Sequence, residues 1–201
     1  MFYIKRKNIL ASSSARVEKT VRLIPRNNTK IIIGKYSSIN GPNTHILSFF
    51  NDVVIGNYTS IAMGVKILDY NHKVTSISTS RIQKLMNINS EADYNSKGPI
   101  IIGNDVWVGM DCIVLSGVTL GNGCIVSANS TVTKNVEPYS IVGGSPARVL
   151  KMRFSKDIIE KLEQIEWWKL DVDALLPYQR IFSKDKLSIE DLMLLESQLK
   201  S

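Results

Sequence analysis

The stretch "VWVGMDCIVLSGVTLGNGCIVSANSTV", residues 106–132, alternates small turn residues with branched aliphatic residues at a period of six. Counting in sixes from the preceding isoleucine gives a branched aliphatic residue every time: Ile102, Val108, Val114, Leu120, Val126 and Val132. The residue after each is glycine in half of the cases, which we interpret as corners where the backbone takes a positive φ. The same register occurs in "IGKYSSIN" from Ile33 and "IGNYTSIAMGVKIL" from Ile55. A period of six fits neither an amphipathic helix nor a β-hairpin ladder.

One short strand and one corner fill six residues, so three such units close a triangular coil of a hexapeptide parallel β-helix. The sequence therefore predicts an all-β main domain in which each residue stacks on the one 18 positions later: Ile102 on Leu120, Val108 on Val126 and Val114 on Val132. Every backbone N–H and C=O can then pair with an adjacent coil. Each inward aliphatic side chain contributes about 1.5–3 kcal/mol by leaving water.

The bulk composition limits the domain count and the partners. A chain of 201 residues with 44% hydrophobic residues favours one main domain with appendages. The net charge of +7 is concentrated at the start, which predicts a basic, solvated N-terminal arm over residues 1–30. No zinc-finger spacing or aromatic-interleaved basic motif supports nucleic-acid binding. No apolar run is long enough for a membrane span or a signal peptide, so we expect no membrane span and a cytoplasmic protein.

The two cysteines predict neither a disulfide nor a metal site. Cys112 and Cys124 are 12 positions apart, which places them on different sides of the triangular coil, beside Ser130 and Val106 respectively. Neither lies in a CxxC or Cys/His metal spacing, and we interpret both as small buried residues with no bound metal.

Four further motifs, together with the repeat, indicate a family resemblance. They are "NH" at residues 71–72, "IIIGNDVWVG" at 100–109, "GGSPAR" at 143–148 and the following "RF…WW" segment. With the repeat, they resemble the hexapeptide-repeat acyltransferases, and within them the xenobiotic acetyltransferase class, which includes type B chloramphenicol and streptogramin acetyltransferases and similar sugar O-acetyltransferases. The resemblance spans about residues 31–170. It implies a left-handed parallel β-helix over residues 31–150, a homotrimer with active sites between subunits, acetyl-CoA as acyl donor and a hydroxyl acceptor.

The repeat breaks over residues 69–99, a polar segment of a length that is usually functional within a compact solenoid. We expect this excursion to reach over the acceptor site or toward a neighbouring subunit. His72 lies at its root and matches the family's catalytic "NH", which predicts a general base worth about 10²- to 10⁴-fold in rate. Asp69 or Asn71 could orient the imidazole, although Asp69 could equally cap the turn. His45 is expected to be a surface or inter-coil residue.

The donor site is assigned by the resemblance. Trp107 follows the inward Val106 and so faces outward, where either a ligand or subunit packing would cover it. The resemblance places Trp107 and Gly109 at the thioester end of the donor and the 143–148 loop against its adenine end. The remaining candidates are the turn amides of Ser127 and Ala128, and three cations for the phosphates: Lys134, Arg148 and Lys151.

The last segment, residues 151–201, is predicted to be a helical cap over the open end of the solenoid. Ser155 precedes "KDIIEKLEQI", in which apolar residues recur at helical spacing, and Trp167 and Trp168 are expected to anchor its packing. Ser188 and Asp191 form a capping-box pattern for a second helix. The apolar residues of that helix are Leu192, Leu194, Leu195 and Leu199.

Alternatives of other classes are weaker. A non-catalytic scaffold solenoid would not need the histidine excursion, and a metal hydratase on the same solenoid needs three histidine ligands where this chain has 2.

The sequence determines the acceptor of the acetyl group less well than the fold. Drug-modifying relatives typically carry a Ser-Thr-x-Pro-Phe-like stretch after the histidine, whereas this chain has Ser-Thr-Ser-Arg at residues 78–81. Loss of the aromatic residue favours a sugar or polysaccharide hydroxyl, with an antibiotic as the alternative.

Overall fold

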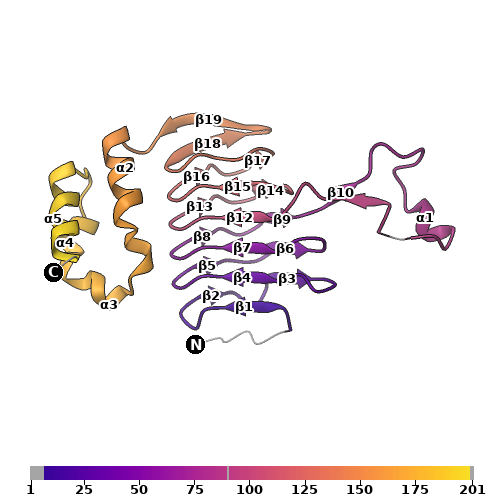
Figure 1. The fold of residues 1–201 in the computed structure, drawn as a ribbon, viewed down its shortest axis with the longest axis horizontal. Helices are drawn as coiled ribbons and strands as arrows, with labels where there is room; N and C mark the ends of the chain where they lie inside the picture. The colour runs from indigo at the N-terminus through magenta and orange to yellow at the C-terminus, as the bar shows by residue number, and fades with distance from the viewer. Residues whose placement is uncertain (1–6, 90, 200–201) are drawn as a thin grey trace.

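The computed structural model describes residues 7–89 and 91–199. Their main part is a left-handed parallel β-helix of about six turns, from which an excursion and a group of C-terminal helices project (Figure 1). The coils stack into three walls. Wall A contains β1 (Ile9–Ala11), β4 (Ile31–Ile33), β7 (Val53–Ile55), β12 (Ile100–Ile102) and β15 (Thr119–Leu120). Wall B contains β2 (Arg16–Val17), β5 (Ser38–Ile39), β8 (Ser60–Ile61), β13 (Trp107–Val108), β16 (Ile125–Val126), β18 (Ser140–Gly144) and β19 (Ala147–Met152). Wall C contains β3 (Arg22–Pro25), β6 (His45–Ser48), β9 (Lys66–Leu68), β14 (Ile113–Val114) and β17 (Thr131–Val132).

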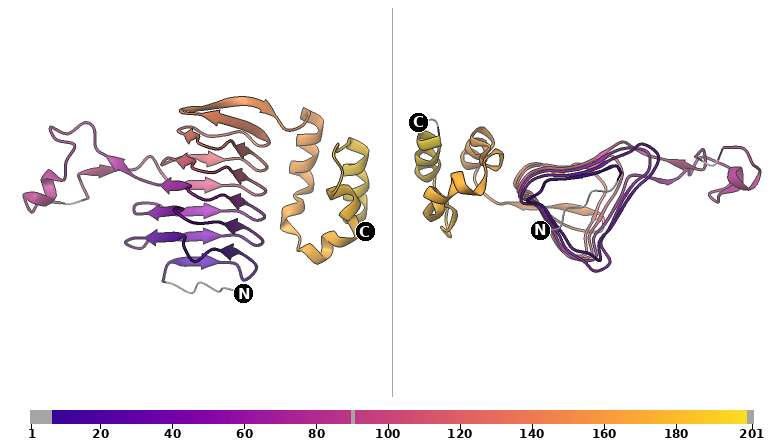
Figure 2. Two further views of the ribbon diagram at one scale, coloured as in Figure 1. Left: turned by 180° about the vertical axis from the view of Figure 1, so that it is seen from behind. Right: turned by 90° about the horizontal axis from the view of Figure 1, so that it is seen from below.

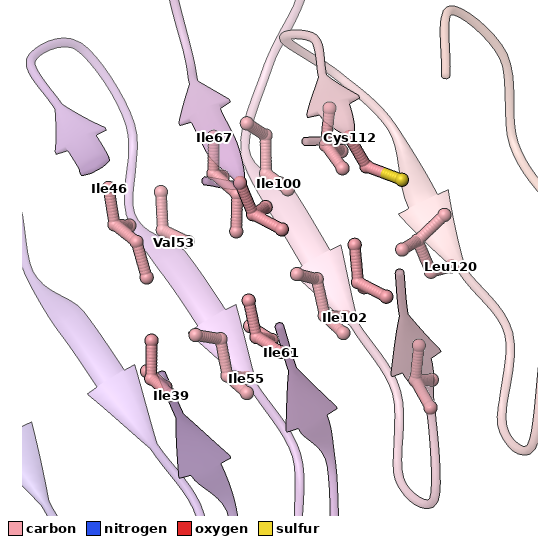
Figure 3. Close-up of a cluster of buried hydrophobic side chains, with 14 of the residues drawn as sticks. Ile39, Ile46, Val53, Ile55, Ile61, Ile67, Ile100, Ile102, Cys112 and Leu120 are labelled. Atoms are coloured by element: carbon pink, nitrogen blue, oxygen red, sulfur yellow. The ribbon is translucent and has the colours of Figure 1, made fainter. Parts of the chain in front are cut away.

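The predicted stacking is confirmed. Ile102 pairs in parallel with Leu120, Val108 with Val126, and Val114 with Val132. The inward aliphatic side chains fill the prism, as Figure 3 shows for Ile61, Ile102 and Leu120 among others, and nearly all are fully buried. Both cysteines belong to this core and are free thiols, as the 12-residue separation predicted. Stacked rows of buried branched residues therefore hold the three walls together.

The corner glycines serve a different purpose from the one predicted. The left-handed backbone conformation occurs three residues after most of the inward aliphatic residues, at Asp105, Asp111 and Gly123 among others, with φ of 53°, 55° and 63°. Gly109, one residue after its aliphatic, is absent from the positive-φ set; a Cβ there would lie 2.6 Å from the amide nitrogen of Ala128. Glycine is required at that position because the next coil approaches too closely for a side chain.

The solenoid starts earlier than predicted. Residues expected to form a solvated arm instead supply a first coil: Ile9 pairs with Ile31, Val17 with Ile39, and Leu23 with Ile46. The six-residue rule missed this coil because its partners lie about 22 positions away, the extra residues being in the corners. The basic residues that the structure describes in this segment, from Lys7 to Lys30, are exposed beside the buried apolar residues Ile9, Val17 and Leu23, so charge did not exclude a structured coil. Residues 1–6 lie outside the described part of the chain.

The C-terminal helices lie beside the solenoid and do not cap its end (Figures 1 and 2). They are α2 (Lys156–Ile165), η1 (Trp167–Lys169), α3 (Val172–Leu175), η2 (Leu176–Tyr178), α4 (Gln179–Phe182) and α5 (Ile189–Leu199). They pack on the corner between walls A and B, where the Tyr58 hydroxyl donates to the Leu170 carbonyl and Asn57 Nδ2 donates to that of Trp168. The last parallel strand of wall B, β18, is instead covered by the antiparallel strand β19.

The helix predictions within this segment are confirmed. α2 begins directly after Ser155, and Trp168 is 2% exposed within a cluster that also contains Tyr139, Leu162 and Leu192. Ahead of α5, the Ser188 amide donates to the Asp191 carboxylate and the Asp191 amide donates to the Ser188 hydroxyl, which is the reciprocal pattern of a capping box.

Candidate active site

The excursion leaves the solenoid at the corner between walls C and A and projects away from it (Figures 1 and 2). Its base is a short antiparallel ribbon of β10 (Asn71–His72) and β11 (Tyr94–Asn95), and its far end carries α1 (Ile82–Leu85). His72 is exposed and lies opposite Tyr94, with ring centroids 4.8 Å apart. Asn71 Nδ2 donates to the Ser116 hydroxyl at 3.3 Å, which ties the ribbon to the solenoid. An exposed imidazole on a braced ribbon can meet an incoming hydroxyl group.

Of the two roles predicted for Asp69, orienting His72 and capping a turn, its contacts match the second. Its fully buried carboxylate accepts three backbone N–H groups of the adjacent coil: Phe49 on Oδ1 at 2.9 Å, and Phe50 and Asn51 on Oδ2 at 2.8 and 2.7 Å. A carboxylate whose two oxygens both accept backbone amides is fixed in place. Asp69 therefore shapes the turn below the excursion, and the orienting role predicted for it is not what these contacts support.

Four of the predicted donor residues, Trp107, Gly109, Ser127 and Ala128, lie on wall B and at the corner between walls B and C. Trp107 is 53% exposed on the outer face of β13, as its position after Val106 predicted. Gly109 follows on the same wall, and its missing side chain lets the Ala128 backbone approach. Ser127 and Ala128 form the next corner, where the Ser127 amide donates to the Val142 carbonyl and Ala128 is exposed. The Ser127 amide is thus already used within the solenoid.

The three predicted phosphate ligands do not form one group in this chain. Arg148 and Lys151 lie exposed on β19, where they pair with Gly143 and Ile141 of β18. Lys134 follows β17 of wall C instead, at the corner from which the excursion leaves two coils earlier. Within one protomer, Lys134 is therefore on the His72 side of the prism and the other two are on the Trp107 side.

The same separation applies to His72 and Trp107. A triangular prism places each wall opposite one corner, and wall B is opposite the corner between walls C and A. Trp107 is exposed on β13 of wall B, whereas β10, which carries His72, belongs to the excursion that leaves from the opposite corner (Figure 2). A wall of about five extended residues spans roughly 15 Å, so the two side chains of one protomer face away from each other across the whole solenoid.

A cavity of about 520 Å³ lies between the excursion, the last part of β3 and the corner at residues 49–50. Four aromatic residues line it: Phe49, Phe50, Tyr70 and Tyr94. Phe49 stacks on Tyr70 at 4.5 Å between ring centroids, and Tyr70 meets Tyr94 edge-on at 5.5 Å. Because Tyr94 also packs against His72, the cavity adjoins the candidate base. Sequence reasoning missed these residues, although aromatic side chains clustered beside the break in the repeat could have indicated them.

The chain matches known families through its repeat. Residues 99–134 match the family model described as bacterial transferase hexapeptide (six repeats). A probable macrolide acetyltransferase of Lysinibacillus sphaericus is 36% identical over 74% of this chain and 87% of that protein. A chloramphenicol acetyltransferase of Agrobacterium fabrum is 34% identical over 72% and 78%. This chain belongs to the hexapeptide-repeat acetyltransferases.

Solved structures of this acetyltransferase family agree with the fold. A hexapeptide-repeat acetyltransferase of Vibrio cholerae, solved in complex with acetyl coenzyme A, is 27% identical with a TM-score of 0.53 and covers 74% of this chain and 72% of its own. A galactoside acetyltransferase in complex with coenzyme A is 26% identical with a TM-score of 0.53 and covers 75% and 66%.

The structure also places the second histidine, His45, and allows a search for metal ligands and membrane-spanning helices. His45 lies on the outer face of wall C, where partial burial and the neighbouring Lys66 and Arg22 lower the pKa of its imidazole. Among the residues that the structure describes, no three His, Cys, Asp or Glu side chains are grouped to hold a metal ion. Over the same residues, every helix is too short or too polar to cross a bilayer.

Proposed function

We propose that this acetyltransferase moves the acetyl group of acetyl-CoA onto a hydroxyl group of a sugar or polysaccharide unit in the cytoplasm, with His72 as the general base. The observation that carries the proposal is the position of His72: exposed, at the base of the excursion that interrupts the solenoid, and beside an aromatic cavity. Membership of the acetyltransferase family supports the reaction class. The acetyl-CoA and coenzyme A complexes of structural relatives support the donor.

The chemistry needs little more than an imidazole and a positioned thioester. A neutral ring nitrogen of His72 accepts the proton of the acceptor hydroxyl while the oxygen attacks the thioester carbonyl. The tetrahedral intermediate then expels the thiolate of coenzyme A, which recovers the proton from the imidazolium, and the acetyl ester is released. Tyr94 packing and the Asn71–Ser116 hydrogen bond hold the ribbon that carries the ring.

We further propose that the site is completed between subunits of a homotrimer. His72 lies on the excursion and the outward Trp107 on wall B, at opposite sides of one prism, so one protomer supplies the base and its neighbour supplies the donor groove along wall B. In that arrangement Lys134 of the first protomer faces the Trp107 side of the second. Lys134 can then act with Arg148 and Lys151 on the donor phosphates, although the three are apart within a single chain.

An antibiotic acceptor is the second candidate. It is favoured by the names of the two relatives above, a macrolide and a chloramphenicol acetyltransferase. A saccharide acceptor is favoured by a galactoside O-acetyltransferase of Escherichia coli, 31% identical over 55% of this chain, and by the Ser-Thr-Ser-Arg run at residues 78–81, where Pro and Phe are missing.

Release of the coenzyme A thiol, measured with acetyl-CoA and a panel of acceptors, tests the proposal. The panel contains free and nucleotide-linked sugars, chloramphenicol and streptogramin A. We expect His72→Ala to lower turnover at least about 10²-fold. His45→Gln is the matched control and should retain wild-type turnover, because His45 lies on wall C away from the excursion. Near-normal turnover of His72→Ala would reject the base, and exclusive acetylation of an antibiotic or an amine would reject the saccharide hydroxyl.

A further inference from the structure

The cavity beside His72 is lined by charged as well as aromatic residues. Three cationic side chains line it: Arg26 from the corner after β3, and Arg81 and Lys84 from the excursion around α1. Glu91 is the one acidic residue among its lining residues, and its carboxylate accepts a hydrogen bond from Asn27 Nδ2. The lining thus combines a net positive charge with a group of aromatic rings.

The neighbouring carboxylates do not neutralise these cations through ion pairs. Asp69 is committed to three backbone amides of residues 49–51. Asp93, also buried, accepts the backbone amides of Gln83 and Lys84. Among the ion pairs formed by the described residues, none includes Arg26, Arg81 or Lys84. Positive charge in this cavity is therefore available to a ligand.

The aromatic residues give the cavity a second property. Arg26 lies over the Phe49 ring at 4.4 Å, and Phe49 in turn stacks on Tyr70. An aromatic face packs well against the C–H face of a sugar ring, and a guanidinium fork beside it binds a carboxylate or phosphate through paired N–H groups. The cavity volume of about 520 Å³ is that of a small-molecule site.

We propose that this cavity selects an acceptor that carries an anionic group, a carboxylate or a phosphate, so that the substrate class is an acidic or phosphate-linked saccharide. Arg81 and Lys84 bind the anion, Arg26 supports it, and Phe49, Tyr70 and Tyr94 hold the sugar ring. The acetylated hydroxyl then lies toward His72, whose ring is 4.8 Å from that of Tyr94. This inference rests on the proposed saccharide O-acetyltransferase and narrows its acceptor.

The test compares charged and neutral acceptors in wild type and in the double variant Arg81→Gln/Lys84→Gln. Glucose, glucuronate, glucose 1-phosphate and a nucleoside-diphosphate glucose serve as probes, and separate the carboxylate from the phosphate as the anion. We expect the anionic sugars to have the higher kcat/KM in wild type, falling about tenfold in the double variant, with the neutral sugar unchanged. Lys156→Gln is the matched control, because this exposed lysine lies on α2 at another corner. The anionic preference should also weaken with added salt.

Binding measured without turnover separates the two proposals. Isothermal titration of each probe into the coenzyme A complex should show tighter binding of the anionic sugars, lost in the double variant. Equal affinity for glucose and the anionic sugars, or no effect of the double substitution, would overturn the inference while sugar acetylation still supported the proposed function. Acetylation of none of the sugars, together with turnover of an antibiotic, would overturn both.

Discussion

Asp69→Asn separates the structural role of this carboxylate from the catalytic role that the sequence suggested. The carboxylate is fully buried and accepts one amide on Oδ1 and two on Oδ2. An asparagine offers one oxygen and one NH₂ group. Its best placement keeps the oxygen toward Phe50 and Asn51 and turns the NH₂ group toward the Phe49 amide, which leaves two donors facing each other.

The expected loss follows from these contacts. Losing one charge-assisted hydrogen bond in a buried site costs about 1.5–3 kcal/mol, and the two retained bonds weaken because their acceptor is neutral. We expect the free energy of unfolding to fall by about 2–4 kcal/mol, which corresponds to a fall in Tm of roughly 5–15 °C for a chain of this size. Because residues 49–50 line the acceptor cavity, the acceptor KM should rise while the pH profile of kcat stays unchanged.

Thermal unfolding and initial rates from pH 5 to 9 provide the assay. Asp52→Asn is the matched control: it lies at the same corner, and its Oδ1 accepts a single amide, that of Lys30 at 2.7 Å. Its Tm should fall by less than a third of the Asp69→Asn change. A wild-type Tm for Asp69→Asn combined with a large loss of kcat and a shifted pH profile would refute the capping role and restore Asp69 as the residue that orients His72.

Other consequences of the structure can be measured on the intact protein. Leu120→Ala empties a fully buried core position and should lower the free energy of unfolding by about 2–5 kcal/mol in denaturant titrations; a change below about 1 kcal/mol would contradict the stacked core. Burial raises the pKa of the Cys124 thiol to about 12 and raises that of Cys112, so iodoacetamide at pH 8 should label neither until the protein is denatured, as mass spectrometry would show. The hydrogen bond from the Lys184 ammonium holds the pKa of the Asp191 carboxyl below its usual range. The ionised carboxylate therefore stabilises α5 above the usual carboxyl pKa, and this stabilisation is lost as the pH falls through the lowered pKa. In Asp191→Asn, the free energy of unfolding should depend less on pH over this acid range.

The period of six predicted the core because inward residues on three walls must repeat wherever the coil closes. It identified the pairs of Ile102, Val108 and Val114 correctly, since those coils contain no extra corner residues. It missed the coil that begins at Ile9, because longer corners shift the spacing without changing the walls. The spacing of residues within a strand therefore indicates which residues face the core of a wall, but it does not indicate how many residues the corner between two walls contains.

The site was less predictable for a related reason. His72 and Trp107 were identified as single residues: His72 from a break in the repeat and its match to the family's "NH", and Trp107 from the family resemblance and its outward position. Their location on opposite sides of the prism depends on how the coils close. The capping role of Asp69 and the cavity beside His72 depend on contacts between the excursion and earlier coils, at residues 24–27 and 47–51, which no spacing within the excursion encodes.

The proposed division of the active site between two protomers of a homotrimer is tested most directly by mixing two variants that we expect to be inactive. His72→Ala and Trp107→Ala chains with different affinity tags are co-expressed, and trimers that carry both tags are isolated and assayed for release of coenzyme A thiol. In a trimer that carries both tags, whichever variant is present twice, about one seam in three has both residues intact, so activity should return to about a third of wild type. Mixed trimers no more active than the separate variants would contradict the account, because the base and the donor groove would then belong to one chain.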